Sequence, residues 1–449
     1  MGKKRSKKFW IIFWSLSIVF LGCWYAFWQI YNKGYGVVED AVEFLPFSEE
    51  NKTLGHLAGY ILKKDNEEKT FLVLFQNNME IRPGGGYIGS FGILTIKNGE
   101  ILKMETHDLS NFDGRIPDTV SPPYPMKETL RINSWKLRDS NFSPDFPTNA
   151  KKAEEFYRMG QGQEKLDGII AINSNVLTSF LKVTGPVEIE GYPGTYSSEN
   201  AILNLEYQVE QGYAKQGIER GERKSVMNGL AKEVLKRVST LGNAQKLELA
   251  KIILEDLKNK DIQLYFKNSE MERHAHDANW NGEMEKNGNE DYLMMVDANM
   301  GSLKSDYYMK RSFEYTVDLS KNVPEANLKI TYNHTAKEKD WMTKNYLTYF
   351  RLYVPANSWL VNSQNTSEVR FGKELDKKYF GTLVNVPLGE TKTIEFNYTL
   401  PSDIDTENYN LMIQKQSGVS QIPGKVTVIG KDGSRKTIEV EIKQDWKLK

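Results

Sequence analysis

The order of apolar and polar positions divides the chain into three parts. Residues 9–31 form an apolar run without a formal charge, behind a basic stretch at residues 1–8. Over residues 67–304, short apolar runs mix with segments in which apolar residues recur every three or four positions. Over residues 305–449, apolar and polar positions alternate with a period of two. This pattern predicts an anchor, an α/β domain and an all-β domain.

The run at residues 9–31 predicts one transmembrane helix, because a helix of that length reaches roughly 34 Å. Residues 1–8 carry five basic side chains and no acidic one, so the positive-inside rule keeps them in the cytoplasm. We therefore expect a single-pass, type II protein of the cell membrane with an extracytoplasmic body. A cleaved signal peptide is the alternative, although the run lacks a small-x-small cleavage motif.

The body is expected to begin after a polar, partly helical stalk at residues 32–66. In the α/β domain we predict a layered α-β-α arrangement around a mixed sheet. Its expected strands lie at residues 71–75, 91–96, 168–172 and 292–296, and helical spacing covers residues 204–238 and 244–257. The all-β domain shows seven strand-like runs separated by Pro, Gly and Asn turns, which predicts an immunoglobulin-like sandwich of the fibronectin type.

Charge and cysteine content narrow the class of partner. The 449 residues include 59 Lys and Arg and 59 Asp and Glu, so the net charge is zero. A protein that binds nucleic acid normally has a basic excess, and we expect no nucleic-acid partner. Cys23 is the only cysteine, which excludes disulfides, a thiolate zinc site and a cysteine nucleophile from the exported part.

A glycine-rich turn between two apolar runs is the first candidate site. Glu80, Arg82 and the glycines at 84–86 lie between the runs at 71–75 and 91–96. Three consecutive glycines lose much chain entropy on folding, which predicts positive φ angles or a close approach of the backbone. Arg82 offers a planar fork suited to carboxylate or phosphate. A hairpin in which Arg82 and Glu80 pair in solvent is the alternative.

A second cationic group lies further along the chain. Arg220, Arg223 and Lys224 are spaced i, i+3 and i+4, so a helix would project them from one face. Three like charges repel unless an anion lies among them, which predicts a phosphate or diphosphate site. The alternative is a solvated face on which Glu219 and Glu222 neutralise the cations.

Other polar residues give weaker signals. Asp108 follows a strand-like run and offers the hard oxygen that Mg²⁺ prefers, although capping a turn is the alternative role. Residues 131–147, which include Arg138, lack periodicity and predict a long ordered loop of the kind that is often functional. His274 and His276 form an H-x-H pair without a third ligand nearby, and we interpret them as surface residues.

Three stretches, at residues 71–94, 133–157 and 166–189, together resemble a family of bacterial membrane-anchored proteins, domain-of-unknown-function family 4012. The resemblance covers roughly residues 60–320. The order of motifs is also remotely similar to the LytR-CpsA-Psr family, which transfers polyprenyl-diphosphate-linked glycopolymers to the cell wall. The matching positions are Arg82, His107-Asp108, Arg131-Ile132-Asn133, the segment 184–187, and Arg220 with Arg223. His107 stands where that family has an arginine, and glycines replace its first-strand aspartate.

The remote resemblance implies a function and a set of roles. By the resemblance, Arg82, Arg220 and Arg223 would hold the diphosphate, and we add Lys224 and Arg138 as further candidate ligand-binding residues. Asp108 would bind Mg²⁺ and act in catalysis with Arg82. The implied protein binds a polyprenyl-diphosphate-linked glycan in the cell envelope and transfers it to a wall or surface acceptor. A non-catalytic envelope scaffold or binding protein is the alternative, and a surface adhesion protein is a third interpretation.

Overall fold

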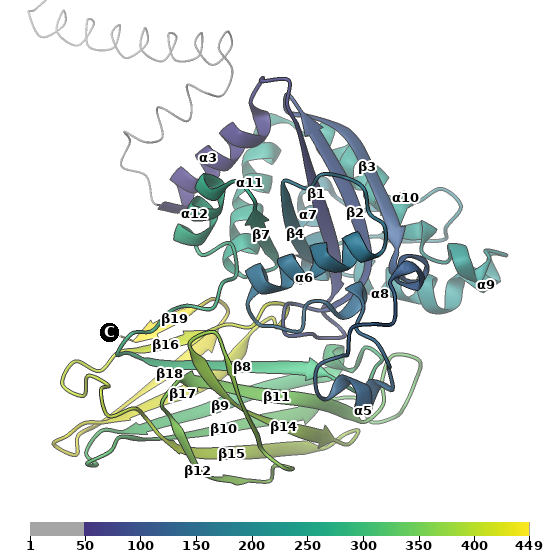
Figure 1. The fold of residues 1–449 in the computed structure, drawn as a ribbon. Helices are drawn as coiled ribbons and strands as arrows, with labels where there is room; N and C mark the ends of the chain where they lie inside the picture. Colours follow the sequence, from purple (N-terminus) through teal and green to yellow (C-terminus); the bar gives the residue numbers. More distant parts are fainter. Residues whose placement is uncertain (1–48, 449) are drawn as a thin grey trace, which may run out of the picture.

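The computed structural model describes residues 49–448 of the chain (Figure 1). The predicted basic tail, the predicted transmembrane run and the first part of the predicted stalk, up to residue 48, lie outside these residues. Within residues 49–448, no helix combines the length and the apolar character needed to cross a membrane.

A five-stranded mixed sheet forms the centre of the N-terminal domain. Its strands are β1 (Glu68–Asn77), β2 (Tyr87–Lys97), β3 (Glu100–Asp108), β4 (Gly168–Asn173) and β7 (Ile262–Phe266). They lie in the order β3-β2-β1-β4-β7, in which only β1 and β4 run parallel. β1 occupies the middle, and six of its successive residues, at positions 69–74, are buried, which requires cover on both faces.

Helices cover both faces of this sheet (Figure 1), which confirms the predicted mixed α/β character. Leu72 and Leu74 of β1 join the core beneath α6 (Phe146–Met159). Phe71 points to the opposite core, as the two-residue period of a strand requires. That second core is closed by α3 (Glu49–Leu62), α7 (Ser174–Thr184), α11 (Asn243–Lys258) and α12 (Ser269–Asp277).

The segment between α7 and α11 is less regular than its helical spacing predicted. It contains β5 (Val187–Glu188), β6 (Thr195–Tyr196), α8 (Ala201–Tyr207), a π-helical turn (Gln208–Gly212), α9 (Tyr213–Lys215), a 3₁₀ turn (Arg220–Glu222) and α10 (Ser225–Ser239). Gly217 takes a φ of 70° and ends α9 in the left-handed conformation. The other short helices are α4 (Leu109–Phe112), α5 (Met126–Leu130) and 3₁₀ turns at Asp113–Arg115, Leu137–Asp139 and Ser305–Tyr308.

Two six-stranded sheets build the C-terminal domain, which confirms that this region is rich in β structure. The first consists of β12 (Trp359–Gln364), β15 (Thr391–Thr399), β10 (Glu325–His334), β9 (Met309–Asp318), β17 (Ile422–Ile429) and β18 (Arg435–Ile442). The second consists of β13 (Arg370–Glu374), β14 (Lys377–Val386), β11 (Tyr346–Pro355), β8 (Asp291–Asn299), β16 (Leu411–Gln414) and β19 (Trp446–Leu448). Side chains such as Phe313 and Phe350 from the two sheets share one apolar core, so the sheets pack face to face.

β8 lies in a different sheet from the one expected. The sequence pattern assigned a strand at residues 292–296 to the α/β domain, before the boundary placed at residue 304. The structure pairs β8 with β11 and β16 of the C-terminal domain. All nine of its residues are buried, so it lacks the two-residue alternation by which the other strands of that domain were recognised.

Loops of the two domains meet in a buried contact that we call the junction. The junction comprises residues 79–86, 142–143 and 259–260 on one side and residues 297–306, 351, 374, 415–418 and 445 on the other. The Asn299 amide donates to the Ile81 carbonyl at 3.0 Å. Lys260 and Asp445 form an ion pair at 2.8 Å with side chains only 3% and 8% exposed. Because a buried charge tolerates the loss of its partner poorly, these contacts fix how the domains dock.

α3 corrects the expectation of a stalk that continues to residue 66. The helix packs on the N-terminal domain beside α12 (Figure 1). Leu57 enters the core, and the ring of His56 stacks on that of His274 with centroids 3.9 Å apart and planes 10° from parallel. The His274 imidazole is therefore part of a helix contact rather than a free surface group.

This contact is expected to weaken in acid. Burial lowers the pKa of His274, and the nearby charges of His56 and Arg273 lower it further, against the opposite effect of Glu270 and Asp277. The unfolded chain, with a histidine pKa of about 6.5, therefore binds protons more readily than the folded chain. The stabilisation is complete above that value and is lost as the pH falls through the lower pKa of the folded state.

Hydrogen exchange of the α3 amides, measured from about pH 7.5 down to about pH 5, should show faster opening in acid after correction for intrinsic rates. His274→Gln should flatten this pH dependence, whereas His276→Gln, at a side chain 56% exposed, should leave it unchanged. An equal pH response in all three proteins would contradict the assignment.

Candidate functional site

Arg82, a predicted catalytic and ligand-binding residue, is held inside the junction. Its side chain is 2% exposed. The guanidinium donates to Asp139 at 2.9 Å, to Glu80 at 3.1 Å and to the Asn299 carbonyl at 3.0 Å. Although burial opposes it, the two carboxylates raise the pKa of Arg82. Arg82 therefore joins the two domains instead of facing an open groove, and the solvent-exposed hairpin considered as the alternative does not describe it either.

The three glycines after Arg82 are also part of the junction, and the predicted close approach of the backbone is confirmed. Gly85 and Gly86 take φ angles of 126° and 154°. A Cβ built on Gly418 would lie 1.9 Å from the Gly85 carbonyl oxygen, and one on Gly84 would lie 2.4 Å from the Asn149 amide. A side chain at Gly85 or Gly418 would push the domains apart, whereas Gly84 and Gly86 lie against Asn149 and Asn77 of their own domain. At Gly85, the other domain of the same chain approaches the backbone.

Asp108, the predicted magnesium ligand, is paired with a cation. It caps α4 by accepting from the Ser110 amide at 2.7 Å, and it accepts from Lys224 Nζ at 2.7 Å. Although burial opposes ionisation, the hydrogen bond from Lys224 lowers the pKa of Asp108. Burial lowers the pKa of Lys224 in turn, against the attraction of Asp108. The capping role named as the alternative is confirmed, and it is combined with an ion pair.

This donor set does not suit Mg²⁺. The ion takes several oxygen ligands in near-octahedral geometry, and an ammonium group occupies Asp108 here. Among residues 49–448, no group of three or more His, Cys, Asp and Glu side chains is placed to hold a metal ion. We therefore assign no chemical step to a metal at Asp108.

The second cationic group forms a turn instead of a helix face. Arg220 lies in a 3₁₀ turn and is exposed, and Lys224 is the residue that precedes α10. Arg223 pairs with Glu210 at 3.1 Å. Within the described part of the chain, the Arg220 side chain has no hydrogen bond or ion pair, and Glu219 and Glu222 form none with the three cations. Two of the three cations are therefore neutralised, by Glu210 and Asp108 and not by the Glu219 and Glu222 that the alternative named.

Lys224 fixes this turn against the central sheet. Besides its bond to Asp108, Lys224 Nζ donates to the Gly89 carbonyl at 2.6 Å, so it bridges β2 and the end of β3. The structure thus brings Lys224 and Asp108 together, with Arg223 and Arg220 on the same turn. We call residues 219–224 the cationic turn.

Arg138 belongs to a separate polar group. It donates to Asp113, whose side chain is 1% exposed. Burial opposes ionisation of Arg138, but the negative charges of its neighbours raise its pKa. Arg82 and Arg138 therefore have their own carboxylate partners, and the structure does not place either of them in contact with the cationic turn.

Residues that the sequence did not single out connect the turn to the junction. Lys304, buried to 8% exposure, lies 3.5 Å from Glu206 and 3.2 Å from Glu210. Glu210 also holds Arg223. The sequence did not predict these ion pairs, because Glu206 and Glu210 lie about a hundred residues before Lys304 in the chain.

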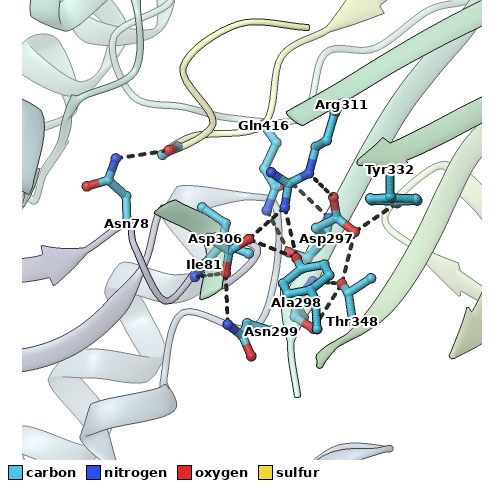
Figure 2. Close-up of polar contacts among 12 residues, drawn as sticks. Asn78, Ile81, Asp297, Ala298, Asn299, Asp306, Arg311, Tyr332, Thr348 and Gln416 are labelled. Atoms are coloured by element: carbon cyan, nitrogen blue, oxygen red, sulfur yellow. Dashed lines mark hydrogen bonds and ion pairs between the residues drawn. The ribbon is translucent and has the colours of Figure 1, made fainter. Parts of the chain in front are cut away.

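A second network missed at the sequence level lies on the C-terminal side of the junction (Figure 2). Arg311 donates to Asp297 at 2.7 Å and to Asp306 at 2.6 Å. Asp306 accepts from the Ile81 amide at 3.0 Å, and Asp297 accepts from Tyr332 at 3.0 Å. This arginine with its two carboxylates supports the turn that carries Arg82.

Neither of two clefts in the described structure is lined by the cationic turn or Asp108. One, of about 540 Å³, lies between the domains, and the other, of about 520 Å³, is a shallow hollow at residues 188–195. An apolar tunnel beside the predicted diphosphate site is therefore not among them.

One family comparison matches part of the chain. Residues 66–209 match the sequence model of a family described as protein of unknown function, DUF4012. This is the family that the three sequence stretches resembled, and the matched region contains β1 to β4, Arg82 and Asp108. No curated protein sequence matches the chain.

Several solved structures are distantly similar. They include gbs0355 of Streptococcus agalactiae (12% identity, TM-score 0.31, covering 49% of this chain and 75% of that one) and B. subtilis TagV (12%, 0.28, 49% and 81%). A third is lpg2210 of Legionella pneumophila (11%, 0.23, 31% and 54%), so the chain spans about half the length of that protein. Similarities at these TM-scores carry no argument about function.

Proposed function

We propose that the protein is a membrane-anchored cell-envelope protein that binds a polyprenyl-diphosphate-linked glycan at the cationic turn. The observation that carries the proposal is the exposed side chain of Arg220, which has no partner among residues 49–448, beside Arg223 and Lys224. A diphosphate would pair with Arg220 and compete with Glu210 for Arg223, and guanidinium groups suit phosphate oxygens in geometry as well as charge. The LytR-CpsA-Psr resemblance assigns the diphosphate to Arg220 and Arg223.

The proposal includes the architecture implied by the sequence. Residues 9–31 would form the single transmembrane helix of a type II protein, with the body outside the membrane. The N-terminal domain would be a LytR-CpsA-Psr-like α/β domain, and the C-terminal domain an immunoglobulin-like sandwich. Arg82 and Arg138 are left out of the ligand site, because each is bound to buried carboxylates of its own.

The site supports binding of the glycolipid better than transfer of its glycan to an acceptor. Transfer of a phosphoryl-linked glycan requires charge stabilisation at the leaving diphosphate and a positioned base or metal. Asp108, the residue proposed for that role, is neutralised by Lys224 at 2.7 Å. The non-catalytic envelope protein considered at the sequence level is therefore favoured over the transferase.

The test is removal of the two arginines. Arg220→Ala combined with Arg223→Ala should weaken binding of the full chain to vesicles carrying undecaprenyl diphosphate at least tenfold, about 1.4 kcal/mol. Co-sedimentation against vesicles without the lipid would measure this, and the effect should diminish as the salt concentration rises.

A matched control removes two cations elsewhere. Lys246→Ala with Lys251→Ala alters exposed residues of α11 that have no ion pair in the described structure, and it changes the net charge equally. Affinity should stay unchanged in this control. If both double variants bind like the unaltered protein, the cationic turn is not the lipid site.

A further inference from the structure

The cleft between the two domains has the properties of a second binding site. Its volume is about 540 Å³, within the range of small-molecule sites. One wall comes from α7 and the start of α8, and the other from residues 306–311 and 418–423. Asn78 and the junction residue Ile81 form its floor, where the Arg311 network lies (Figure 2).

The floor of the cleft is electrically balanced and firmly held. Arg311 and Asp306 both line the cleft, and their ion pair at 2.6 Å cancels their charges. Asn78 donates to Asn175 at 3.2 Å and to the Gly418 carbonyl at 3.1 Å. The lining contains two further charged residues, Glu199 and Lys310, so two acids and two bases give it no net charge.

The walls carry neutral polar groups that are not engaged. The side chains of Thr178, Tyr307, Ser420 and Gln421 line the cleft, and none of them makes a hydrogen bond within residues 49–448. Tyr307 is 48% exposed. Apolar side chains such as Ile202, Leu203 and Met309 lie among these groups. A hydroxyl or amide that is free to donate and accept suits a partner with many hydroxyl groups.

We infer that this cleft binds an uncharged carbohydrate segment. A pyranose ring presents hydroxyl groups around its rim and an apolar face, which match the unengaged amide and hydroxyl groups and the exposed Tyr307 ring. An anionic ligand would find no surplus positive charge here, because Arg311 is committed to Asp297 and Asp306. The cleft therefore differs in chemistry from the cationic turn.

The cleft and the cationic turn are linked through one helical segment. α8 contributes Ile202 and Leu203 to the cleft, and its continuation carries Glu210, which binds Arg223 of the turn. A single glycolipid could therefore place its diphosphate on the turn and its glycan in the cleft. Only this connection rests on the proposed function. Carbohydrate binding in the cleft is inferred from the residues that line the cleft.

The test uses soluble, uncharged tetrasaccharides without lipid or phosphate. Titration of the full chain in detergent with chitotetraose, cellotetraose and maltotetraose should show saturable binding of at least one sugar, with a Kd of about 1 mM or tighter. Tyr307→Ala combined with Gln421→Ala should weaken it at least tenfold, about the change that loss of two contacts produces. Trp359→Ala, at an aromatic residue of β12 that is 70% exposed and lies outside the cleft, should bind like the unaltered protein.

The outcomes separate the two sites. Absence of saturable binding for all three sugars, or equal affinity in the Tyr307/Gln421 variant, would overturn the inference. Loss of undecaprenyl diphosphate binding in the Arg220/Arg223 variant with intact sugar binding would support both sites. Sugar binding without any diphosphate binding would refute the proposed function alone. Diphosphate binding without any sugar binding would refute only the inference that the cleft binds carbohydrate.

Discussion

Replacement of Arg311 by methionine should lower the free energy of unfolding of the C-terminal domain by about 3–5 kcal/mol. Arg311 is 6% exposed and neutralises Asp297 and Asp306, each 4% exposed. Methionine fills similar space without charge, so two buried carboxylates would lose their cation. Denaturant unfolding followed by tryptophan fluorescence would measure the loss, and a separate transition for each domain is expected.

Two controls make this expectation specific. Arg435→Met removes an exposed arginine of β18 that has no ion pair in the described structure, and it should leave stability unchanged. Adding Asp297→Asn and Asp306→Asn to Arg311→Met should restore part of the loss, because the buried carboxylate charges disappear together with their partner. If the single variant unfolds at the same denaturant concentration as the unaltered protein, the network is not a stabilising element.

Arg82→Met should have an effect of similar size, about 3–5 kcal/mol, located at the junction. It removes the cation from Glu80 and Asp139 and the donor from the Asn299 carbonyl. Because the bond to Asn299 crosses between the domains, the variant should become sensitive to limited proteolysis at residues that the junction protects. Mass spectrometry of early fragments would locate the cuts.

The matched control is Arg158→Met on α6, an arginine 38% exposed that pairs with Glu154. Such a surface pair contributes at most about 1 kcal/mol. Normal stability and protease resistance of Arg82→Met, together with lost affinity for undecaprenyl diphosphate, would instead support the prediction that Arg82 binds the diphosphate. The two roles are therefore distinguishable in one pair of variants.

Local sequence was sufficient to predict elements whose cause is local. The apolar runs at 71–75 and 91–96 do form β1 and β2, and the alternation after residue 305 does produce strands. The three glycines did signal a close approach of the backbone. The residue that approaches Gly85 was not predictable, because Gly418 is nearly as distant in the chain as Gln416 is from Arg82, to which it is bonded across a separation of 334.

The predicted site was only partly assembled for a related reason. The prediction from the spacing of Arg220, Arg223 and Lys224 assumed a continuous α-helix. The π-helical turn and Gly217 interrupt the helix before these residues. Lys224 and Asp108 do lie together as predicted residues of the site, but their opposite charges neutralise each other. Arginines that look available in a sequence are committed here to carboxylates such as Asp139, whose position depends on the tertiary fold.

β8 has a practical consequence for dividing the gene into expressible pieces. A fragment that starts at residue 305 would lack the strand that hydrogen-bonds to β11 on one side and β16 on the other. β11 and β16 would each have an unpaired edge in such a fragment, and unpaired strand edges favour self-association. Recombinant work on the C-terminal half should therefore begin ahead of Asp291, and chimeras that exchange this half between homologues should carry that strand with it.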